Sequence, residues 1–373
     1  MRDLRVSQAD GALVPGEWDS VMDEQVHDFL RASGPVLCVD IGSSTQKAML
    51  ARAGQECANW PRWLLPSPAR LVGQRIRELT LLKCGVWLSG CIMGDGFCDA
   101  LRGHLDAGLP TAATQAAARA IDADSEAVRA LGVTITETCP ANCVPVHLED
   151  FSPGFWDCLL RISALPQPHT VLAAVQDHGS HTDAIGHGRM EGWHLLLNES
   201  PAPASWIYAK VPASMSRLHA LQQKTGGPVA DTATCAILGA LCDAAVLERS
   251  FREGITIVNV GNEHTLAALV YQGQVCGLYE HHTERRGLPL LLEDLRKLRL
   301  RWLPTEDVHA SGGHGTAFGA QCEAAGSFAP TYLLGARRNL LAGHGRDIAP
   351  HGDMSHAGCF GLLHGWAHGR PHS

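Results

Sequence analysis

The sequence predicts an α/β protein made of two related domains that face each other across a cleft. Its 373 residues, of which 45% are hydrophobic and 18% charged, can bury the cores of two domains of ordinary size. Short runs of β-forming residues alternate with helical patterns along the chain. In addition, the stretches Val39–Cys57 and Val258–Cys276 share the same spacing of strands and turns. This duplication indicates one kind of domain built twice.

The first half begins with an arm, residues 1–34, that is expected to contain one short helix over residues 18–30. Three strands should follow as a meander, because glycine-containing turns near residues 42 and 54 separate runs of β-forming residues over 35–40, 46–53 and 57–65. Further elements are predicted from hydrophobic spacing: helices over 71–81, 99–105 and, in two pieces, 111–130, and strands over 85–88, 143–147 and 170–175.

The second half repeats the arrangement. A helix over 230–247 has an apolar face of small residues and can pack closely against a neighbour. A second meander is predicted over 255–260, 264–271 and 275–279, and a helix over 288–303 should cover its sheet. The tail from Gly335 is rich in glycine, histidine and proline, which predicts loops and short elements. We therefore expect an arm (1–34), a first domain with a helical insertion (35–160) and a second domain (161–373).

Composition limits the partners and the location. The net charge of -8 and the pI near 6.2 argue against nucleic acid as a partner. No apolar run is long enough to cross a bilayer, and the N-terminal segment lacks the apolar core of a signal peptide. Thirteen cysteines, an odd number, fit reduced thiols better than a disulfide framework. We expect a cytoplasmic protein without membrane partners.

The duplicated turns have the composition of phosphate-binding turns. Glycine lets the backbone approach a phosphate, while consecutive N–H groups and hydroxyls donate hydrogen bonds to it. The candidate nucleotide-binding residues are Gly42, Ser43, Ser44 and Thr45 in the first turn, and Gly261, Asn262, His264 and Thr265 in the second. Asp40 precedes only the first turn and is placed to hold a hydrated Mg²⁺. The alternative is that any two β-meanders share glycine turns.

The stretch VDIGSSTQKAML resembles the first phosphate motif of the superfamily of actin, heat-shock chaperone ATPases, sugar kinases and dehydratase-activating ATPases, and NVGNEHTLAALV resembles the second. The resemblance implies two ribonuclease H-like domains, the actin-like ATPase fold, around a central cleft for ATP and Mg²⁺. It also implies metal-handling positions at Asp40 and Asn259. The superfamily commonly has an acidic residue where this chain has Asn259. Either Glu263 substitutes for it, or the site binds nucleotide without efficient hydrolysis.

A second resemblance extends along the whole chain. The segments LSGCIMGDGF, AVQDHG, VADTATCAILGAL, NVGNEHTLA, GGHG and GCFGLL are similar to a prokaryotic family, domain of unknown function 1786. Its members often carry the label of a pyruvate formate-lyase activating enzyme. A radical activase of that kind needs a CxxxCxxC motif to hold an iron–sulfur cluster. The nearest match, Cys139 and Cys143, has no third cysteine after it, so the sequence disfavours this activity.

Asp177, His178 and Asp231 are the candidates for catalysis. Asp177 and His178 lie in a loop that resembles the substrate-side loop of some carbohydrate kinases. With His181, Asp183 and His187, the same segment could instead hold a divalent metal, or it could be a plain polar loop. Asp231 starts the small-residue helix, where sugar kinases have a general base, and its alternative role is a helix N-cap.

The glycine turn of Gly312 and Gly313 is a candidate for contact with adenine and ribose, because such a flat ligand needs the backbone close to it. Two functions follow from these residues. The first is an ATP-dependent enzyme, either a kinase of a small hydroxylated substrate or an ATPase. The second is a nucleotide-binding regulator or activator, acting on a partner protein with little turnover.

Overall fold

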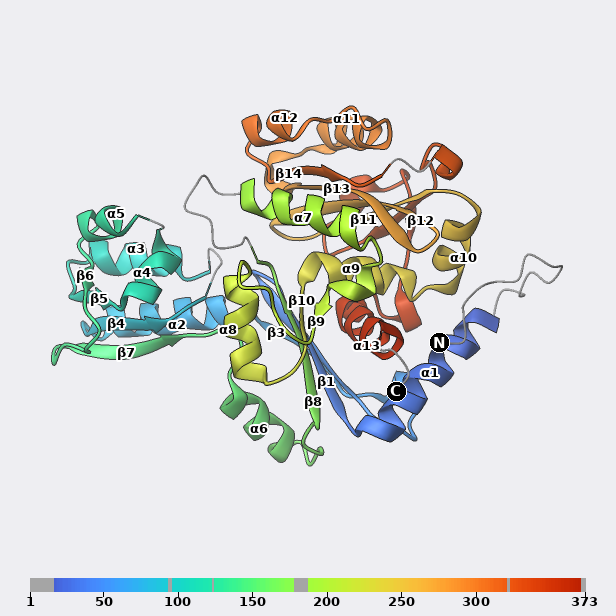
Figure 1. Cartoon of the computed structure of the whole chain (residues 1–373). Helices are drawn as coiled ribbons and strands as arrows, with labels where there is room; N and C mark the ends of the chain where they lie inside the picture. Colours follow the sequence, from blue (N-terminus) through green and yellow to red (C-terminus); the bar gives the residue numbers. More distant parts are fainter. Residues whose placement is uncertain (1–16, 93–95, 123, 178–186, 321–322, 370–373) are drawn as a thin grey trace.

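The computed structural model describes residues 17–92, 96–122, 124–177, 187–320 and 323–369. It consists of two main six-stranded sheets that lie on either side of a pair of helices, with a smaller α/β unit attached to the first sheet (Figure 1). None of the helices within these ranges is long and apolar enough to cross a membrane.

The first sheet has the strand order β3-β2-β1-β8-β10-β9. Strand β1 is antiparallel to β2 and parallel to β8, and β8 is parallel to β10. The bounds are β1 (Val36–Ile41), β2 (Thr45–Ala51), β3 (Arg62–Pro66), β8 (Thr170–Val175), β9 (Ile207–Tyr208) and β10 (Val229–Asp231). A 3-10 turn at Cys57–Asn59 precedes β3, so the third strand starts later than predicted.

The second sheet has the order β14-β13-β12-β11-β15-β16. Its strand β11 is antiparallel to β12 and parallel to β15, as β1 is to β2 and β8. The bounds are β11 (Ile255–Val260), β12 (His264–Tyr271), β13 (Gln274–His282), β14 (Gly315–Phe318), β15 (Thr331–Leu334) and β16 (Arg346–Asp347). The repeated meander and its parallel neighbour confirm the prediction of two ribonuclease H-like units with the actin-like ATPase fold.

The predicted boundary at residue 160 does not match these sheets. Strands β8 and β10 belong to the first sheet although they follow that residue, because β8 pairs with β1 along its whole length. The C-terminal helix α13 (Ala357–Gly369) also packs on the first sheet, through Cys359, Phe360 and Leu363. The chain thus returns twice to its first sheet.

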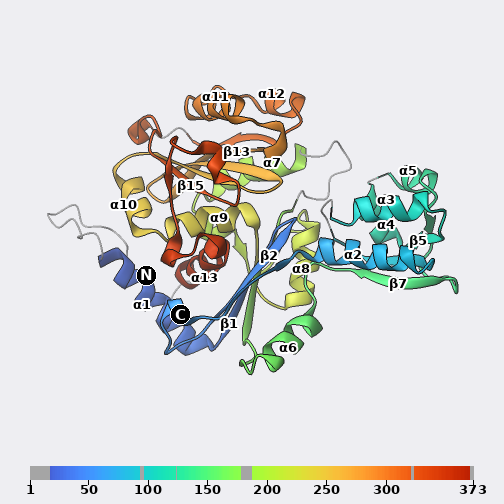
Figure 2. The ribbon, with the colours of Figure 1, turned by 180° about the vertical axis from the view of Figure 1, so that it is seen from behind.

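The predicted helical insertion has a sheet of its own. Four parallel strands run in the order β6-β5-β4-β7. Together with four helices they enclose a separate apolar core. The elements are α2 (Pro68–Leu81), β4 (Gly85–Gly90), α3 (Cys98–Asp106), β5 (Thr111–Ala113), α4 (Gln115–Ile121), α5 (Ser125–Ala130), β6 (Thr134–Ile135) and β7 (Cys143–Leu148). This unit projects sideways from the main body, as the view from behind also shows (Figure 2).

Helix α9 (Thr232–Leu241) packs against α13 between the two main sheets (Figure 1). The contact is very close: a Cβ added at Gly239 would lie 2.2 Å from the Ala357 carbonyl oxygen, and one at Gly361 would lie 2.3 Å from that of Cys235. The prediction of a small-residue face that packs closely is therefore confirmed. The predicted helix over 230–247 ends early, however, because Asp243 caps a new helix, α10 (Ala244–Arg252).

The remaining helices pack on both faces of the sheets: the inner cores that contain α9 and α13 also include residues of the helices at 17–33 and 187–199. The core on the outer face of the first sheet includes residues of α6 and α8, and that of the second includes residues of α11 and α12. Their bounds are α1 (Glu17–Ser33), α6 (Pro153–Ile162), α7 (His187–Glu199), α8 (Ser216–Thr225), α11 (Leu288–Arg299) and α12 (Thr305–Ala310). Helix α13 was not predicted, since its glycines and histidines suggested a loop.

Candidate functional site

The carboxyl ends of the parallel strands bring the predicted site residues together. Strands β1, β8 and β10 are parallel, so Asp40, Asp177 and Asp231 lie at one edge of the first sheet. In the second sheet, β11 and β15 end at the edge that also carries the end of β13. Open α/β sheets bind ligands at this edge. The two edges face each other in the middle of the molecule.

The first turn is closed by a hydrogen bond from the Gly42 N–H to the Thr45 carbonyl, at 3.0 Å. It is fixed from behind by Ser67, the N-cap of α2. The Ser67 N–H donates to the Ser44 carbonyl and its hydroxyl donates to the Ser43 carbonyl. Among the described residues, no group accepts a hydrogen bond from the backbone N–H of Ser43 or Ser44. These donors remain available to an anion.

The second turn has the same closure, since the Gly261 N–H donates to the His264 carbonyl at 2.9 Å. It is held from behind by Thr283, whose hydroxyl donates to the Gly261 carbonyl and whose N–H donates to that of Glu263. Thr265 is fully buried and shares a hydrogen bond with the Thr283 hydroxyl. Thr265 therefore supports the turn and does not present its hydroxyl to a ligand.

The two turns face each other directly. The Ser44 hydroxyl lies 3.4 Å from Glu263 Oε1, and these two residues hold equivalent positions in the duplicated stretches. This contact confirms that the two glycine turns meet, and their place in a nucleotide cleft stays a prediction.

Asp40 and Asn259 also hold equivalent positions, each beside a glycine that leaves room for it. A Cβ added at Gly358 would lie 2.5 Å from Asp40 Oδ2, and one at Gly335 would lie 2.6 Å from Asn259 Oδ1. Within the described ranges, the Asp40 carboxylate has no hydrogen bond or ion pair. Burial raises its pKa, against the opposing charges of Lys47 and His356. Asp40 is half-buried, and an unpaired carboxylate that is partly shielded from water fits a cation ligand, because an uncompensated charge there is costly.

Asp231 caps α9 and lies at the centre of a buried ionic network. Its Oδ1 accepts from the Ala233 N–H and Arg189 Nη2, and its Oδ2 accepts from the Asp177 N–H and Arg189 Nη1, at 2.7 to 2.9 Å. Each oxygen thus already accepts two hydrogen bonds. The cap role is confirmed, and so is the prediction that Asp231 and Asp177 meet at one end of the cleft.

Arg189 connects the two sheets. Besides Asp231, it donates to Glu280 at the end of β13, and its side chain is 2% exposed. Gln176 donates to the same Glu280 carboxylate at 2.8 Å. Burial opposes the ionisation of Glu280, but the guanidinium outweighs it and lowers the pKa of this carboxyl. This bridge was missed from sequence, because Arg189 and Glu280 are 91 positions apart and no local pattern links them.

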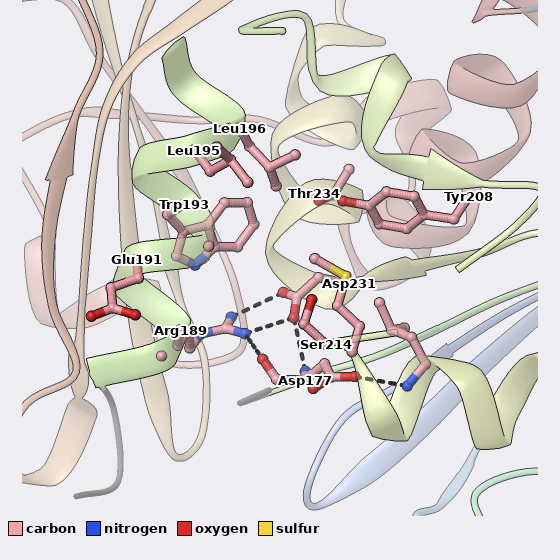
Figure 3. Close-up of a pocket in the computed structure, with 14 residues that line it drawn as sticks. Asp177, Arg189, Glu191, Trp193, Leu195, Leu196, Tyr208, Ser214, Asp231 and Thr234 are labelled. Carbon is pink, nitrogen blue, oxygen red and sulfur yellow. Dashed lines mark hydrogen bonds and ion pairs between the residues drawn. The ribbon is translucent and has the colours of Figure 1, made fainter. Parts of the chain in front are cut away.

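A cavity of about 320 Å³ opens beside this network. Figure 3 shows Asp177, Asp231 and Arg189 at one end of it, with the Trp193 side chain beside them. Tyr208 and Thr234 line it too, and the hydroxyl end of Tyr208 points toward Thr234 (Figure 3). Neither buried hydroxyl has a hydrogen-bond partner among the described residues. His178, His181 and Asp183 lie outside the described residues, as does the side chain of His187.

Three histidines meet at the edge of the second sheet: His264 at the start of β12, His282 at the end of β13, and His314 just before β14. Burial lowers the pKa of His264 to about 4 and also lowers the pKa of His314, while Glu280 opposes both shifts. The lowered pKa values favour the neutral form of His264 and His314 at pH 7.

The Gly312–Gly313 turn is occupied by side chains of its own domain. A Cβ added at Gly312 would lie 1.9 Å from Arg285 Nη1, and one at Gly313 would lie 2.3 Å from His281 Cδ2. These glycines permit close packing, so contact with adenine stays a prediction. A glycine that sequence reasoning missed, Gly335, follows β15 directly beside the second turn, and the Arg337 N–H after it donates to the Val260 carbonyl.

Comparison with family models identifies the chain. Residues 93–340, well over half of it, match the model described as "Putative pyruvate format-lyase activating enzyme (DUF1786)". The chain belongs to this family. The resemblance seen in the sequence is thereby confirmed. Within the described residues, the one group of three side chains that could hold a metal is the histidine trio, and no three cysteines lie close enough together to do so. A comparison with curated proteins found no match.

The chain is similar, at low identity, to several solved structures. A polyphosphate/ATP-glucomannokinase from Arthrobacter sp. strain KM is 10% identical, with 88% of this chain and 96% of that chain covered and a TM-score of 0.36. A Bacteroides thetaiotaomicron protein with an actin-like ATPase fold and unknown function is 8% identical, with 90% and 98% covered and a TM-score of 0.35. The ethanolamine utilization protein EutJ from Carboxydothermus hydrogenoformans is 8% identical, with 92% and 98% covered and a TM-score of 0.31.

Proposed function

We propose that this protein binds ATP with Mg²⁺ between its two turns and transfers a phosphoryl group to a small hydroxylated acceptor, or hydrolyses the nucleotide. One observation carries the proposal: the duplicated turns, each closed by the same backbone hydrogen bond, meet face to face at Ser44 and Glu263. Proteins that transfer phosphoryl groups rely mainly on positioning and charge stabilisation, which two facing turns can provide.

The donors and acceptors at the two turns suit different parts of the ligand. The free N–H groups of Ser43 and Ser44 would bind phosphate oxygens, since consecutive amides form an anion site. Asp40 would hold the hydrated Mg²⁺, which neutralises phosphate charge when bound. Glu263 reaches the first turn and is a better oxygen ligand than Asn259, so we propose it as the second metal-handling residue.

The cavity beside Asp231 is the proposed acceptor site. A buried hydroxyl without a partner loses the hydrogen bonds that it would make to water. An acceptor with several hydroxyl groups would restore them at Tyr208 and Thr234. The polar end formed by Asp177, Asp231 and Arg189 lies in the same cavity. Asp231 can act as a general base only if one of its present donors withdraws, and Arg189 is the one that is a side chain.

A nucleotide titration tests the proposal. Calorimetry with ATP, with and without Mg²⁺, should show Mg²⁺-dependent binding that Asp40→Asn weakens by at least about tenfold. Asp106→Asn is the matched control, because Asp106 is exposed at the end of α3 in the attached unit. Measurement of phosphate release then follows. Absence of nucleotide binding in the wild-type protein would contradict the proposal.

The second candidate function is a nucleotide-binding regulator that acts on a partner protein with little turnover. Asn259 favours it, because an amide at this position handles a metal less well than a carboxylate. Tight binding without phosphate release would support this function over the enzyme. For either function we propose a cytoplasmic location, which the content of thirteen cysteines supports.

A further inference from the structure

We propose that His264, His282 and His314 form a binding site for a divalent transition metal, with Zn²⁺ as the ion that fits best. No step of the proposed phosphoryl transfer uses these three side chains as a group. The site would lie beside the second turn, because the His264 carbonyl accepts the hydrogen bond that closes that turn.

The geometry of the three rings is nearly that of an equilateral triangle. Their centroids are 4.7 Å (His264 to His282), 5.0 Å (His264 to His314) and 4.9 Å (His282 to His314) apart, with interplanar angles of 41 to 44°. One ring nitrogen from each lies within 4.8 Å of the others. Nitrogens bound tetrahedrally to Zn²⁺ at about 2.1 Å are roughly 3.4 Å apart. Small side-chain rotations would therefore complete the site.

The sheet fixes the positions of these side chains. His264 and His282 are direct cross-strand partners on β12 and β13. The His314 N–H donates to the Glu280 carbonyl at 3.0 Å, which holds the third histidine next to them. Two neighbouring strands and the residue that directly precedes a third thus supply one ligand each. A site built on strands is rigid, and a rigid site loses little entropy when a metal binds.

The ring nitrogens of His264 and His282 have no hydrogen-bond partner among the described residues. These nitrogens are therefore free to coordinate an ion. Three imidazoles suit Zn²⁺ and its first-row neighbours, whereas Mg²⁺ takes oxygen ligands. The site is thus distinct in chemistry from the one proposed at Asp40. Three protein ligands leave a fourth position open for water or a ligand oxygen.

The test measures metal binding to the full-length protein, without reference to nucleotide. The protein is stripped with a chelator and titrated with Co²⁺, whose visible absorption reports nitrogen coordination, and then with Zn²⁺ in calorimetry. We expect one ion per chain. His264→Gln, His282→Gln and His314→Gln should each weaken Zn²⁺ binding by at least about 100-fold. His219→Gln is the control, because His219 is exposed on α8, and it should bind like wild type.

Circular dichroism and thermal melting establish that each variant is folded. If His314→Gln does not fold, the two half-buried positions, His264 and His282, carry the test. The proposal is overturned if the wild-type protein binds no ion, or if His282→Gln and His264→Gln keep wild-type affinity and stoichiometry. The proposal is also overturned if Zn²⁺ binding survives in His264→Gln and His282→Gln but is lost when His178 and His181 are replaced together. Because ATP is absent, failure here leaves the nucleotide proposal intact.

Discussion

Replacing Asp231 should cost far more stability than the loss of a helix cap, because the same carboxylate pairs with Arg189 in the interior. Asn and Asp are equivalent N-caps, and truncation of a cap to Ala costs roughly 1 kcal/mol. The pair with Arg189 is 2% and 9% exposed, and removal of one partner from a buried ion pair costs about 3–5 kcal/mol. Glu280 still faces Arg189, so the lower end of that range applies.

The expected free energies of unfolding follow from these contacts. Asp231→Asn keeps the bond to the Ala233 N–H and loses the charge, so it should cost about 2–3 kcal/mol, while Asp231→Ala should cost about 4 kcal/mol. Urea unfolding measures both. The double variant with Arg189→Met isolates the pair, with an expected coupling energy of about 1–3 kcal/mol. If Asp231→Ala cost only about 1 kcal/mol, the ionic network would contribute nothing and the reasoning would fail.

Turnover separates the structural role of Asp231 from a catalytic one. If Asp231 is a general base in the transition state, its replacement should lower the turnover rate by about 100-fold or more, with little change in nucleotide affinity. Asp231→Asn is the informative variant, because it keeps the cap and the shape of the site. A folded Asp231→Asn protein with wild-type turnover would restrict Asp231 to its positioning and capping role.

Three further outcomes follow from single contacts. Asp40→Asn should leave thermal stability unchanged or slightly raised, since an amide is less costly to bury than an unpaired carboxylate; a clear loss in a melting curve would show that Asp40 supports the core. Gly361→Ala should destabilise by about 1–3 kcal/mol, because its Cβ would lie 2.3 Å from the Cys235 carbonyl oxygen in the contact of α9 with α13. Gly103→Ala, in open space on α3, is the helical control and should be neutral or stabilising in the same urea experiment. Burial holds the pKa of His364 well below 6.5, so the unfolded chain takes up a proton that the folded chain does not, and stability falls as the pH decreases below 6.5. The stability difference between pH 7.5 and pH 5.5 should therefore shrink in His364→Leu, and an unchanged difference would assign the pH dependence to other groups.

The strands of both meanders could be predicted because a hydrophobic run between two glycine turns indicates a strand from the local sequence alone, without knowledge of tertiary contacts. The predicted meander strands 255–260 and 264–271 match β11 and β12 residue for residue, and so does the predicted strand 170–175, which is β8, the parallel neighbour of β1. Helix α13 could not be predicted, because glycines lower helix propensity. Gly358 and Gly361 are there to admit Asp40 and α9, which is a tertiary requirement that the local sequence does not reveal.

The candidate site was predictable in part for the same reason. Local motifs located Asp40 and both turns, and the duplication predicted that they face each other. The ionic bridge and the histidine trio depend on which strands become neighbours. Arg189 and Glu280 come from different layers, and the three histidines meet only because β12, β13 and β14 are adjacent. The spacing of residues along the chain does not predict which of these distant side chains become neighbours.

The duplicated turns offer different ligand atoms. In the first, Asp40, Ser44 and Thr45 provide oxygen atoms, which suit phosphate and a hydrated Mg²⁺. In the second, the positions equivalent to Asp40 and Thr45 hold Asn259 and His264. His264 then joins two histidines from neighbouring strands, and nitrogen ligands suit a softer ion. The exchange of a hydroxyl for an imidazole at this position thus gives the second turn a nitrogen ligand where the first turn has an oxygen. The variant His264→Thr restores the residue found at the equivalent position of the first turn. It should abolish Co²⁺ binding and preserve Mg²⁺–ATP binding, and a titration of each ligand measures both outcomes.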